Sequence, residues 1–367
     1  MRNENRLKLG LFAPNCSGGL CITSAPDRWV PSWENNLETA RIADEAGLEF
    51  LLPIGRWRGY GGPSDFEGES LETITWATGL LAHTSRLTVF GTIHAPMFHP
   101  IVAAKQMATI DLLSEGRFGV NVVCGWNQDE FEMFGFDQRE HDERYEYGQE
   151  WLDVVRTIWR EDEPADFDGR YFHLRGLVGK PHPYGGTEPV LMNAGYSPAG
   201  RAFAVRNCEL LVTSLIDLES ARRDVESVKA AARELGREID LLGTAYVVCR
   251  PTGSEAEEFL RYYADEHADW EAADHLMALA GVHAQFFPPE HYQTQRERFV
   301  GGHGGYPIVG DPDHVADELE LIADSGFAGV AFGLFDFARE LPYFCEEVLP
   351  RLEARGVRGR GPVTTTG

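Results

Sequence analysis

The chain has 367 residues, of which 43% are hydrophobic, and it carries a formal net charge of −25. This length and apolar content suffice for one large core, whereas the acidic balance makes binding to nucleic acid or to an anionic membrane unfavourable. No apolar run is long enough to span a bilayer or to act as a signal peptide, so we expect no membrane association and a cytoplasmic location. Six cysteines are scattered without zinc-binding spacing, and we expect reduced thiols and no metal site.

Strand-like and helix-like segments alternate along the chain. Short apolar runs bounded by glycine, proline or polar residues predict the strands. They span residues 8–12, 49–53, 87–91, 118–123, 189–193, 210–213, 241–249 and 329–334. Eight strands that alternate with helices predict an α/β protein with a (β/α)8 TIM barrel, in which chemistry takes place at the C-terminal ends of the strands.

Amphipathic spacing and end signals predict the helices between these strands. Gly47 stands where a left-handed residue ends a helix, Pro100 opens one, and Asp217 caps one that ends at Gly236. A further helix is opened by residues 194–198, and a last one ends near residue 353. The other predicted helices span about residues 33–46, 71–83, 100–113, 143–159, 218–235, 253–280 and 312–325.

Three segments depart from the alternation. Residues 161–187 are rich in proline, glycine and aromatic residues and predict an insertion. Residues 281–308 predict a long irregular insertion ending in a glycine cluster, which is typical of a lid over a site. Residues 355–367 predict a flexible tail. We therefore expect one barrel domain over residues 1–354.

The strand at 118–123 gives the most specific indication of chemistry. Asn121 lies in an apolar run bounded by glycines, and burying an asparagine there is costly without hydrogen-bond partners. Either neighbouring backbone satisfies this side chain, or it faces a polar cofactor at the mouth of the barrel. Thr92, after the preceding strand, is either an ordinary β-branched strand residue or a hydroxyl donor to the same cofactor.

Further candidates follow the later strands. Ser197 opens a helix, where it is either a plain N-cap or, with the N–H groups of Gly195 and Tyr196, a phosphate-binding residue. Arg144 either holds the same phosphate in a fork or is a solvated arginine. Glu130 belongs to an acidic loop, and the alternative to a functional role for it is an exposed position in that loop.

Two histidines, His94 and His99, follow the third strand. A histidine near neutral pH can donate a proton or hold a hydrogen bond, although ordinary loop positions are the alternative for both. No carboxylate stands at metal-ligand spacing beside them, so they do not indicate a metal. The other candidate lining residues of a substrate pocket are Arg56, Trp57, Arg58 and Trp126.

Several motifs occur in order along the chain. LSEGR at 113–117 and VGDPDHVA at 309–316, followed by ADSGF at 323–327, resemble signatures of the bacterial luciferase-like flavin monooxygenases. Four further motifs resemble the branch that holds dimethylsulfone monooxygenase, alkanesulfonate monooxygenase and pyrimidine oxygenase. They are NCSGG at 15–19, AKQMATID at 104–111, VNVVCGW at 120–126 and HDERY at 141–145. The resemblance runs from about residue 7 to residue 351.

This resemblance implies a two-component monooxygenase that uses reduced FMN (FMNH2) and O2 and depends on a separate NAD(P)H-dependent flavin reductase. It also implies a homodimer or homotetramer. Thr92 and Asn121 match residues beside the reacting edge of the flavin, and with His94 and Trp126 they are the candidate catalytic residues. The positions that match flavin contacts are Gly55, Arg56, Thr92, Asn121, Glu130, Arg144, Tyr145, Gly195, Tyr196 and Ser197.

The expected reaction inserts oxygen into a small organic substrate and cleaves a C–S, C–N or C–halogen bond. The residues after Thr92 differ from those of the sulfone and pyrimidine branches, so the sequence does not name the substrate. Two alternatives keep the fold but change the function. One is a hydride-transfer oxidoreductase that uses the deazaflavin F420, and the other is a flavin-binding protein without catalysis.

Overall fold

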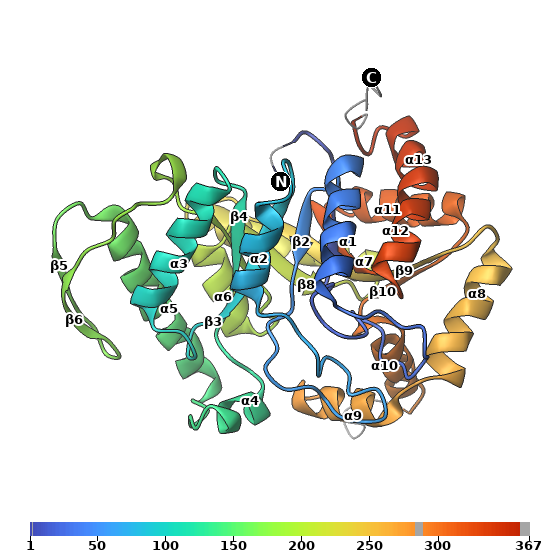
Figure 1. Ribbon diagram of the computed structural model, residues 1–367, viewed down its shortest axis with the longest axis horizontal. Coiled ribbons are helices and arrows are strands. Elements are labelled where there is room, and N and C mark those ends of the chain that lie inside the picture. Colours follow the sequence, from blue (N-terminus) through green and yellow to red (C-terminus); the bar gives the residue numbers. More distant parts are fainter. Residues whose placement is uncertain (2, 283–288, 360–367) are drawn as a thin grey trace.

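The computed structural model describes residues 1, 3–282 and 289–359. Within this part of the chain, eight parallel strands close into a barrel, because β11 pairs with both β1 and β9 (Figure 1). The barrel strands, in order around the barrel, are β1 (Lys8–Phe12), β2 (Phe50–Leu52), β3 (Thr88–His94), β4 (Phe118–Val123), β7 (Val190–Asn193), β8 (Leu210–Ser214), β9 (Asp240–Cys249) and β11 (Gly329–Gly333). The predicted (β/α)8 barrel is confirmed.

Helices surround the barrel in Figure 1. The predicted end signals act as expected: Gly47 ends α1 at φ 79°, and Asp217 accepts hydrogen bonds from the Glu219 and Ser220 N–H groups of α7. The structure adds Ser32 as the cap of α1. The surrounding helices are α1 (Trp33–Ala46), α2 (Thr73–Leu81), α3 (Pro100–Leu113), α5 (His141–Arg160), α6 (Pro198–Asn207), α7 (Leu218–Glu234), α11 (Pro312–Asp324), α12 (Phe337–Glu347) and α13 (Leu349–Ala354).

Aromatic and aliphatic side chains fill the barrel interior. Phe50 on β2 and Phe90 on β3 meet edge to face, with ring centroids 6.1 Å apart. Glycines on the neighbouring strands make room for these rings, since a Cβ on Gly10 would lie 2.3 Å from the Phe50 ring and one on Gly119 2.4 Å from the Phe90 ring. The other buried members of this cluster are Leu52, Met192, Leu210, Val212, Leu242 and Ala331.

The mouth of the barrel at the C-terminal strand ends is more open than its interior. Side chains two residues apart on a strand point to the same face, so Ser214 follows Val212 inward and Thr244 follows Leu242. Both are partly exposed although their strands are otherwise almost entirely buried. Phe12 on β1, Val123 on β4 and Ala194, directly after β7, are also partly exposed. The strand ends are therefore not packed solid.

Short helices gather at this mouth, on the side opposite the chain termini in Figure 1. Helices α9 and α10 pack against each other there, and His275 of α9 contacts Asp129 of α4. The segments are α4 (Gln128–Met133), α8 (Gly253–Arg261), the π-helical turn η2 (Tyr262–Glu266), α9 (Trp270–Leu279) and α10 (Pro289–Gly302).

The prediction of an irregular segment over 281–308 is wrong for its described part. Residues 289–302 form α10, and β10 (Tyr306–Gly310) adds a parallel strand to the C-terminal half of β9. Glycine helps the end of α10 to pack closely, because a Cβ on Gly302 would lie 2.3 Å from the Tyr246 side chain. Residues 283–288 of this predicted insertion lie outside the described residues.

The other departures are local. The predicted insertion at 161–187 contains an antiparallel hairpin of β5 (Ala165–Asp168) and β6 (His173–Leu177), followed by the short turn η1 (Tyr184–Gly186). Of the predicted tail, residues 355–359 are packed rather than flexible: Val357 is buried, and Arg358 forms a buried ion pair with Glu49 at 2.7 Å. The rest of that tail lies outside the described residues. Among described residues, no helix is long and apolar enough to cross a membrane.

Candidate active site

Thr92 and Asn121 lie side by side at the mouth of the barrel. They are register partners on β3 and β4, and both are buried. The Thr92 hydroxyl donates to the Pro53 carbonyl at 2.7 Å, and the Asn121 amide nitrogen donates to Thr92 Oγ1 at 3.3 Å. Asn121 Oδ1 is buried and has no hydrogen-bond partner among the described residues. A buried carbonyl oxygen without a donor is costly, so this atom is suited to accept from a bound molecule.

Gly55 brings the loop after β2 against this pair. A Cβ there would lie 2.7 Å from the His94 ring and 3.1 Å from the Thr92 methyl group, so only glycine allows the approach. His94, two residues beyond Thr92 on β3, points to the same face and is 3% exposed. Burial is the main cause that lowers the pKa of His94 to about 4, and it outweighs the opposing charge of Glu130. The imidazole is therefore neutral at physiological pH.

A buried charge cluster adjoins Gly55. Arg56 Nε pairs with Glu67 at 2.7 Å, and its Nη1 pairs with Glu130 at 3.0 Å. The Trp57 N–H also donates to Glu130, at 2.8 Å, and the guanidinium lies 5.5 Å from the centre of the Trp126 ring. Glu130 is completely buried, so the alternative of an exposed acidic loop is wrong for this residue.

This cluster has one more carboxylate than it has arginines. Glu67 Oε1 and Glu130 Oε2 are buried without a hydrogen-bond partner among the described residues. His303 Nε2 lies 3.6 Å from the free Glu67 oxygen, and burial is the main cause that lowers the pKa of His303. Two free carboxylate oxygens in a dry environment favour N–H or O–H donors on any molecule that binds beside them.

A second group of predicted residues lies around the N-terminus of α6. Ser197 caps this helix by accepting from the Gly200 N–H at 3.1 Å, and Tyr145 hydrogen-bonds Ser197. Gly195 packs closely, since its Cβ would lie 3.0 Å from the Tyr145 hydroxyl. Arg144 donates to the Gly125 carbonyl at 2.8 Å, which links this group to the loop that carries Trp126.

The donors of this second group suit an anion. The Arg144 Nε atom is buried and has no hydrogen-bond partner within the described part of the chain. The first N–H groups of a helix carry a partial positive charge and favour a phosphate. Tyr196 differs from its neighbours because it is 65% exposed, so it offers its backbone rather than a buried ring. The N-cap role of Ser197 does not exclude phosphate binding.

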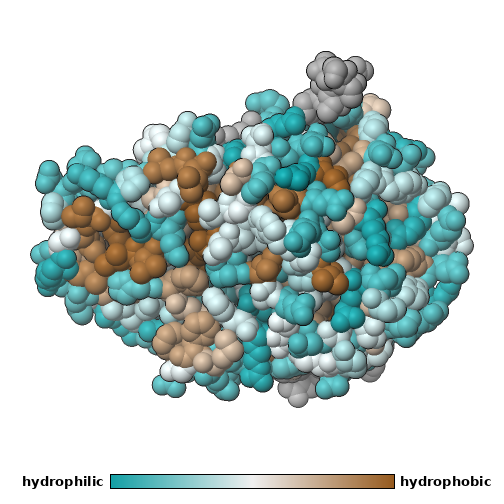
Figure 2. All heavy atoms as spheres, in the orientation of Figure 1, coloured by the Kyte–Doolittle hydropathy of each residue, from teal (hydrophilic) through white to brown (hydrophobic). Residues whose placement is uncertain are grey.

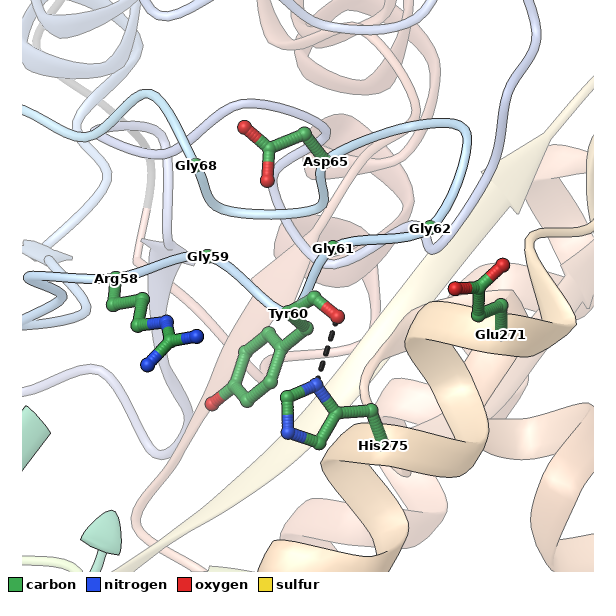
Figure 3. Close-up of a pocket in the computed structure, with 9 residues that line it drawn as sticks. All are labelled: Arg58, Gly59, Tyr60, Gly61, Gly62, Asp65, Gly68, Glu271 and His275. Carbon is green, nitrogen blue, oxygen red and sulfur yellow. Dashed lines mark hydrogen bonds between the residues drawn. The ribbon is translucent and has the colours of Figure 1, made fainter. Parts of the chain in front are cut away.

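A polar hollow of about 520 Å³ opens beside the charge cluster, between the loop after β2 and α9 (Figure 3). Tyr60 of this loop lies beside α9, where His275 hydrogen-bonds the Tyr60 carbonyl at 2.9 Å. The centre of the Tyr60 ring lies 4.7 Å from the Arg56 guanidinium. Arg58, predicted to line a substrate pocket, lines this hollow with Asp65 and Glu271 (Figure 3). His99 lies elsewhere and caps α3, accepting from the Ile101 N–H at 3.3 Å.

Sequence reasoning missed three contributors to this site. Glu67, which completes the charge cluster, lies in the loop after β2 and has no motif around it. Tyr60 belongs to a glycine and aromatic loop that gave no chemical indication. Asn15 was part of the NCSGG motif, but no role followed from the motif alone.

Comparison with known proteins shows the family of the chain. The family described as "Luciferase-like monooxygenase" matches residues 7–329 of the chain. The chain belongs to this family. It is therefore a luciferase-like monooxygenase and an oxidoreductase, as the motifs predicted.

The chain is also similar to individual proteins and solved structures. It is similar to the FMNH2-dependent dimethylsulfone monooxygenase of Pseudomonas fluorescens, with 31% identity over 98% of each chain. It is 29% identical to pyrimidine monooxygenase RutA of Caulobacter segnis, and the match covers 95% of this chain and 100% of RutA. Among solved structures, DmoA from Hyphomicrobium sulfonivorans shares the fold with a TM-score of 0.84 at 21% identity, covering 96% of this chain and 89% of DmoA.

Proposed function

We propose that this luciferase-like monooxygenase is a two-component enzyme that uses FMNH2 and O2 to insert oxygen into a small organic substrate. The reaction cleaves a C–S, C–N or C–halogen bond of that substrate. The observation that carries the proposal is the free Asn121 Oδ1, buried beside Thr92 at the mouth of the barrel. The relatives named for dependence on FMNH2 support the same cofactor.

The residues present fit a flavin mononucleotide. Asn121 offers its free carbonyl oxygen to the polar edge of a flat ring, and the Thr92 hydroxyl, whose proton goes to Pro53, offers its second lone pair. Glu130 offers its free oxygen to a ring N–H. Arg144 and the α6 N-terminus suit the phosphate at the other end of the cofactor. The remaining proposed contacts come from Gly55, Arg56, Tyr145, Gly195, Tyr196 and Ser197.

Bound FMNH2 supplies the two electrons that activate O2, and the protein supplies position, polarity and dryness. Neutral His94 gives or accepts a hydrogen bond beside Thr92 without adding a charge. The Trp126 ring lies against Arg56 and keeps water from the flavin ring, which protects an oxygen-activating flavin from unproductive decay. His94, Thr92, Asn121 and Trp126 are the proposed catalytic residues.

The substrate reaches the flavin from the polar hollow beside Tyr60. The charged side-chain groups of Arg58, Asp65 and Glu271 line this hollow and, within the described part of the chain, form no ion pair, so their charges are available to a polar substrate. A separate NAD(P)H-dependent reductase provides FMNH2. We also propose a cytoplasmic homodimer or homotetramer with a single barrel domain in each subunit.

The test is a comparison of cofactors and an oxygen balance. Anaerobic titration of the purified protein with FMNH2 should give saturable binding, whereas F420 should bind weakly or not at all. With FMNH2 and air, loss of a substrate from a panel of sulfones, sulfonates, pyrimidines and chlorinated aromatics should require O2, and the H2O2 formed from FMNH2 and O2 should fall by the amount of substrate lost. Tight F420 binding with oxygen-independent turnover would replace the proposal by a hydride-transfer enzyme. FMN binding without any turnover would leave a flavin-binding protein.

A further inference from the structure

The NCSGG motif holds a buried asparagine that joins two distant segments. Asn15 follows β1 and is completely buried. Its Oδ1 accepts from the Ile54 N–H at 3.0 Å, while its Nδ2 donates to the Ile54 carbonyl at 2.8 Å and the Leu71 carbonyl at 3.1 Å. The Leu71 N–H also donates to the Asn15 carbonyl at 2.9 Å. One residue thus holds both ends of segment 54–71, which we call the arginine loop.

The arginine loop carries several groups of the proposed flavin site. Gly55, which packs against His94, directly follows Ile54, the residue that Asn15 hydrogen-bonds. Arg56 follows and pairs with Glu130. The Arg56 carbonyl accepts from the Ser70 hydroxyl at 2.9 Å, so the two limbs of the loop are also joined directly beside the contact with Asn15. A displacement at Asn15 would therefore move Gly55 and Arg56 relative to β3.

The primary amide of asparagine suits this place chemically. The peptide of Ile54 requires one acceptor for its N–H and one donor for its carbonyl, and Leu71 requires a second donor. An amide side chain provides all three, whereas a carboxylate has no donor and would face two carbonyl oxygens in a buried position. The NCSGG backbone supports the same arrangement, since the Ser17 N–H donates to the Glu69 carbonyl at 2.8 Å.

We infer that Asn15 is a positioning residue, which holds the arginine loop so that Gly55 and Arg56 are in place before the flavin binds. The inference that Asn15 affects flavin binding rests on the proposed function. The inference that Asn15 orders the arginine loop in the free protein is independent of that function. A loop held in its binding conformation avoids the entropy loss of ordering it on binding, so loss of the contact should weaken binding.

The experiment compares Asn15→Asp with a matched variant, Asn36→Asp. Asn36 lies on α1, is 1% exposed, and also uses both ends of its amide. Its Oδ1 accepts from the Trp76 indole at 2.8 Å, and its Nδ2 donates to the Ser32 carbonyl at 3.0 Å. N36D therefore places the same buried carboxylate away from the arginine loop and controls for a general loss of stability.

Two readouts separate positioning from stability. The first is the Kd for FMN, measured by quenching of flavin fluorescence; we expect an increase of about tenfold in N15D and less than about twofold in N36D. The second is the rate of tryptic cleavage after Arg58, an exposed residue of the arginine loop, in the protein without flavin. That rate should rise about tenfold in N15D alone, because cleavage follows the population of the open loop.

Equal FMN affinity and equal cleavage in N15D and N36D would overturn the inference and leave Asn15 a structural residue. If the wild-type protein does not bind FMN, the proposed function fails, and the cleavage rates still decide whether Asn15 orders the loop. If N15D does not fold, Asn15→Ser takes its place. Amide exchange of residues 55–58 should then be faster in N15S than in the wild type, and unchanged exchange would refute the role.

Discussion

His94 provides a direct test of the electrostatics at the barrel mouth. Its ring is buried against Gly55, and this burial lowers its pKa from the ordinary 6.5 to about 4. The unfolded chain therefore binds a proton at a higher pH than the folded protein does. The stability that neutral His94 contributes is fully present above pH 6.5 and is lost as the pH falls towards 4.

The size of the effect follows from the two pKa values. A tenfold difference in proton affinity corresponds to about 1.4 kcal/mol, so the full loss is about 3 kcal/mol. About 2 kcal/mol of it should already be lost at pH 5. Replacing His94 by asparagine removes the titrating group. From pH 7.5 to 5, the wild type should therefore lose about 2 kcal/mol more free energy of unfolding than H94N does.

Urea unfolding followed by tryptophan fluorescence, at several pH values and constant salt, gives these free energies. His83→Asn is the matched control, because it makes the same substitution at an exposed position outside the barrel mouth. NMR titration of the His94 ring gives an independent value of its pKa. The same slope with pH in H94N and wild type, or a His94 ring that titrates near 6.5, would refute the argument.

Four further substitutions test the site. Arg56→Met leaves two buried carboxylates without their cation, so the free energy of unfolding should fall by about 3–5 kcal/mol in denaturant titrations, and a loss under about 1 kcal/mol would contradict the cluster. Asn121→Ala and Thr92→Ala should cut substrate oxygenation at least about tenfold while the Kd for FMNH2 changes little, and turnover equal to the wild type would remove the proposed roles. Arg144→Met should weaken FMN about tenfold but leave riboflavin, which lacks the phosphate, nearly unchanged; equal losses for both ligands would place Arg144 away from the phosphate.

Local chemistry explains why the barrel could be predicted from the sequence. Each barrel strand is a short apolar run with its own end signals, and those signals act over a few residues. Gly47 ends α1 because a left-handed residue is favoured there, and Pro100 opens α3 because its missing N–H has no partner in the first turn. The same locality made the motif residues recognisable in order along the chain.

The segment around α10 could not be predicted because its glycines serve packing. The glycine cluster that contains Gly301 and Gly302 indicates an irregular segment by composition, yet these two residues end α10 against the Tyr246 ring, where a Cβ would lie 2.9 and 2.3 Å away. β10 pairs with the C-terminal half of β9, which is distant in sequence, so the residues of β10 alone do not specify this strand. Close packing between segments that are far apart leaves no periodic pattern along the chain.

Strand ends and motifs are local features, so the barrel, the family and most residues of the proposed cofactor site could be predicted from the order of residues along the chain. Which of these residues are buried and paired became clear from the folded molecule. Glu130, one acid in an acidic run, is completely buried against Arg56, and Glu67 joins them from a loop without a motif. Asn15 holds that loop from another part of the chain. Burial and pairing depend on distances between segments, and those distances exist only once the barrel has closed.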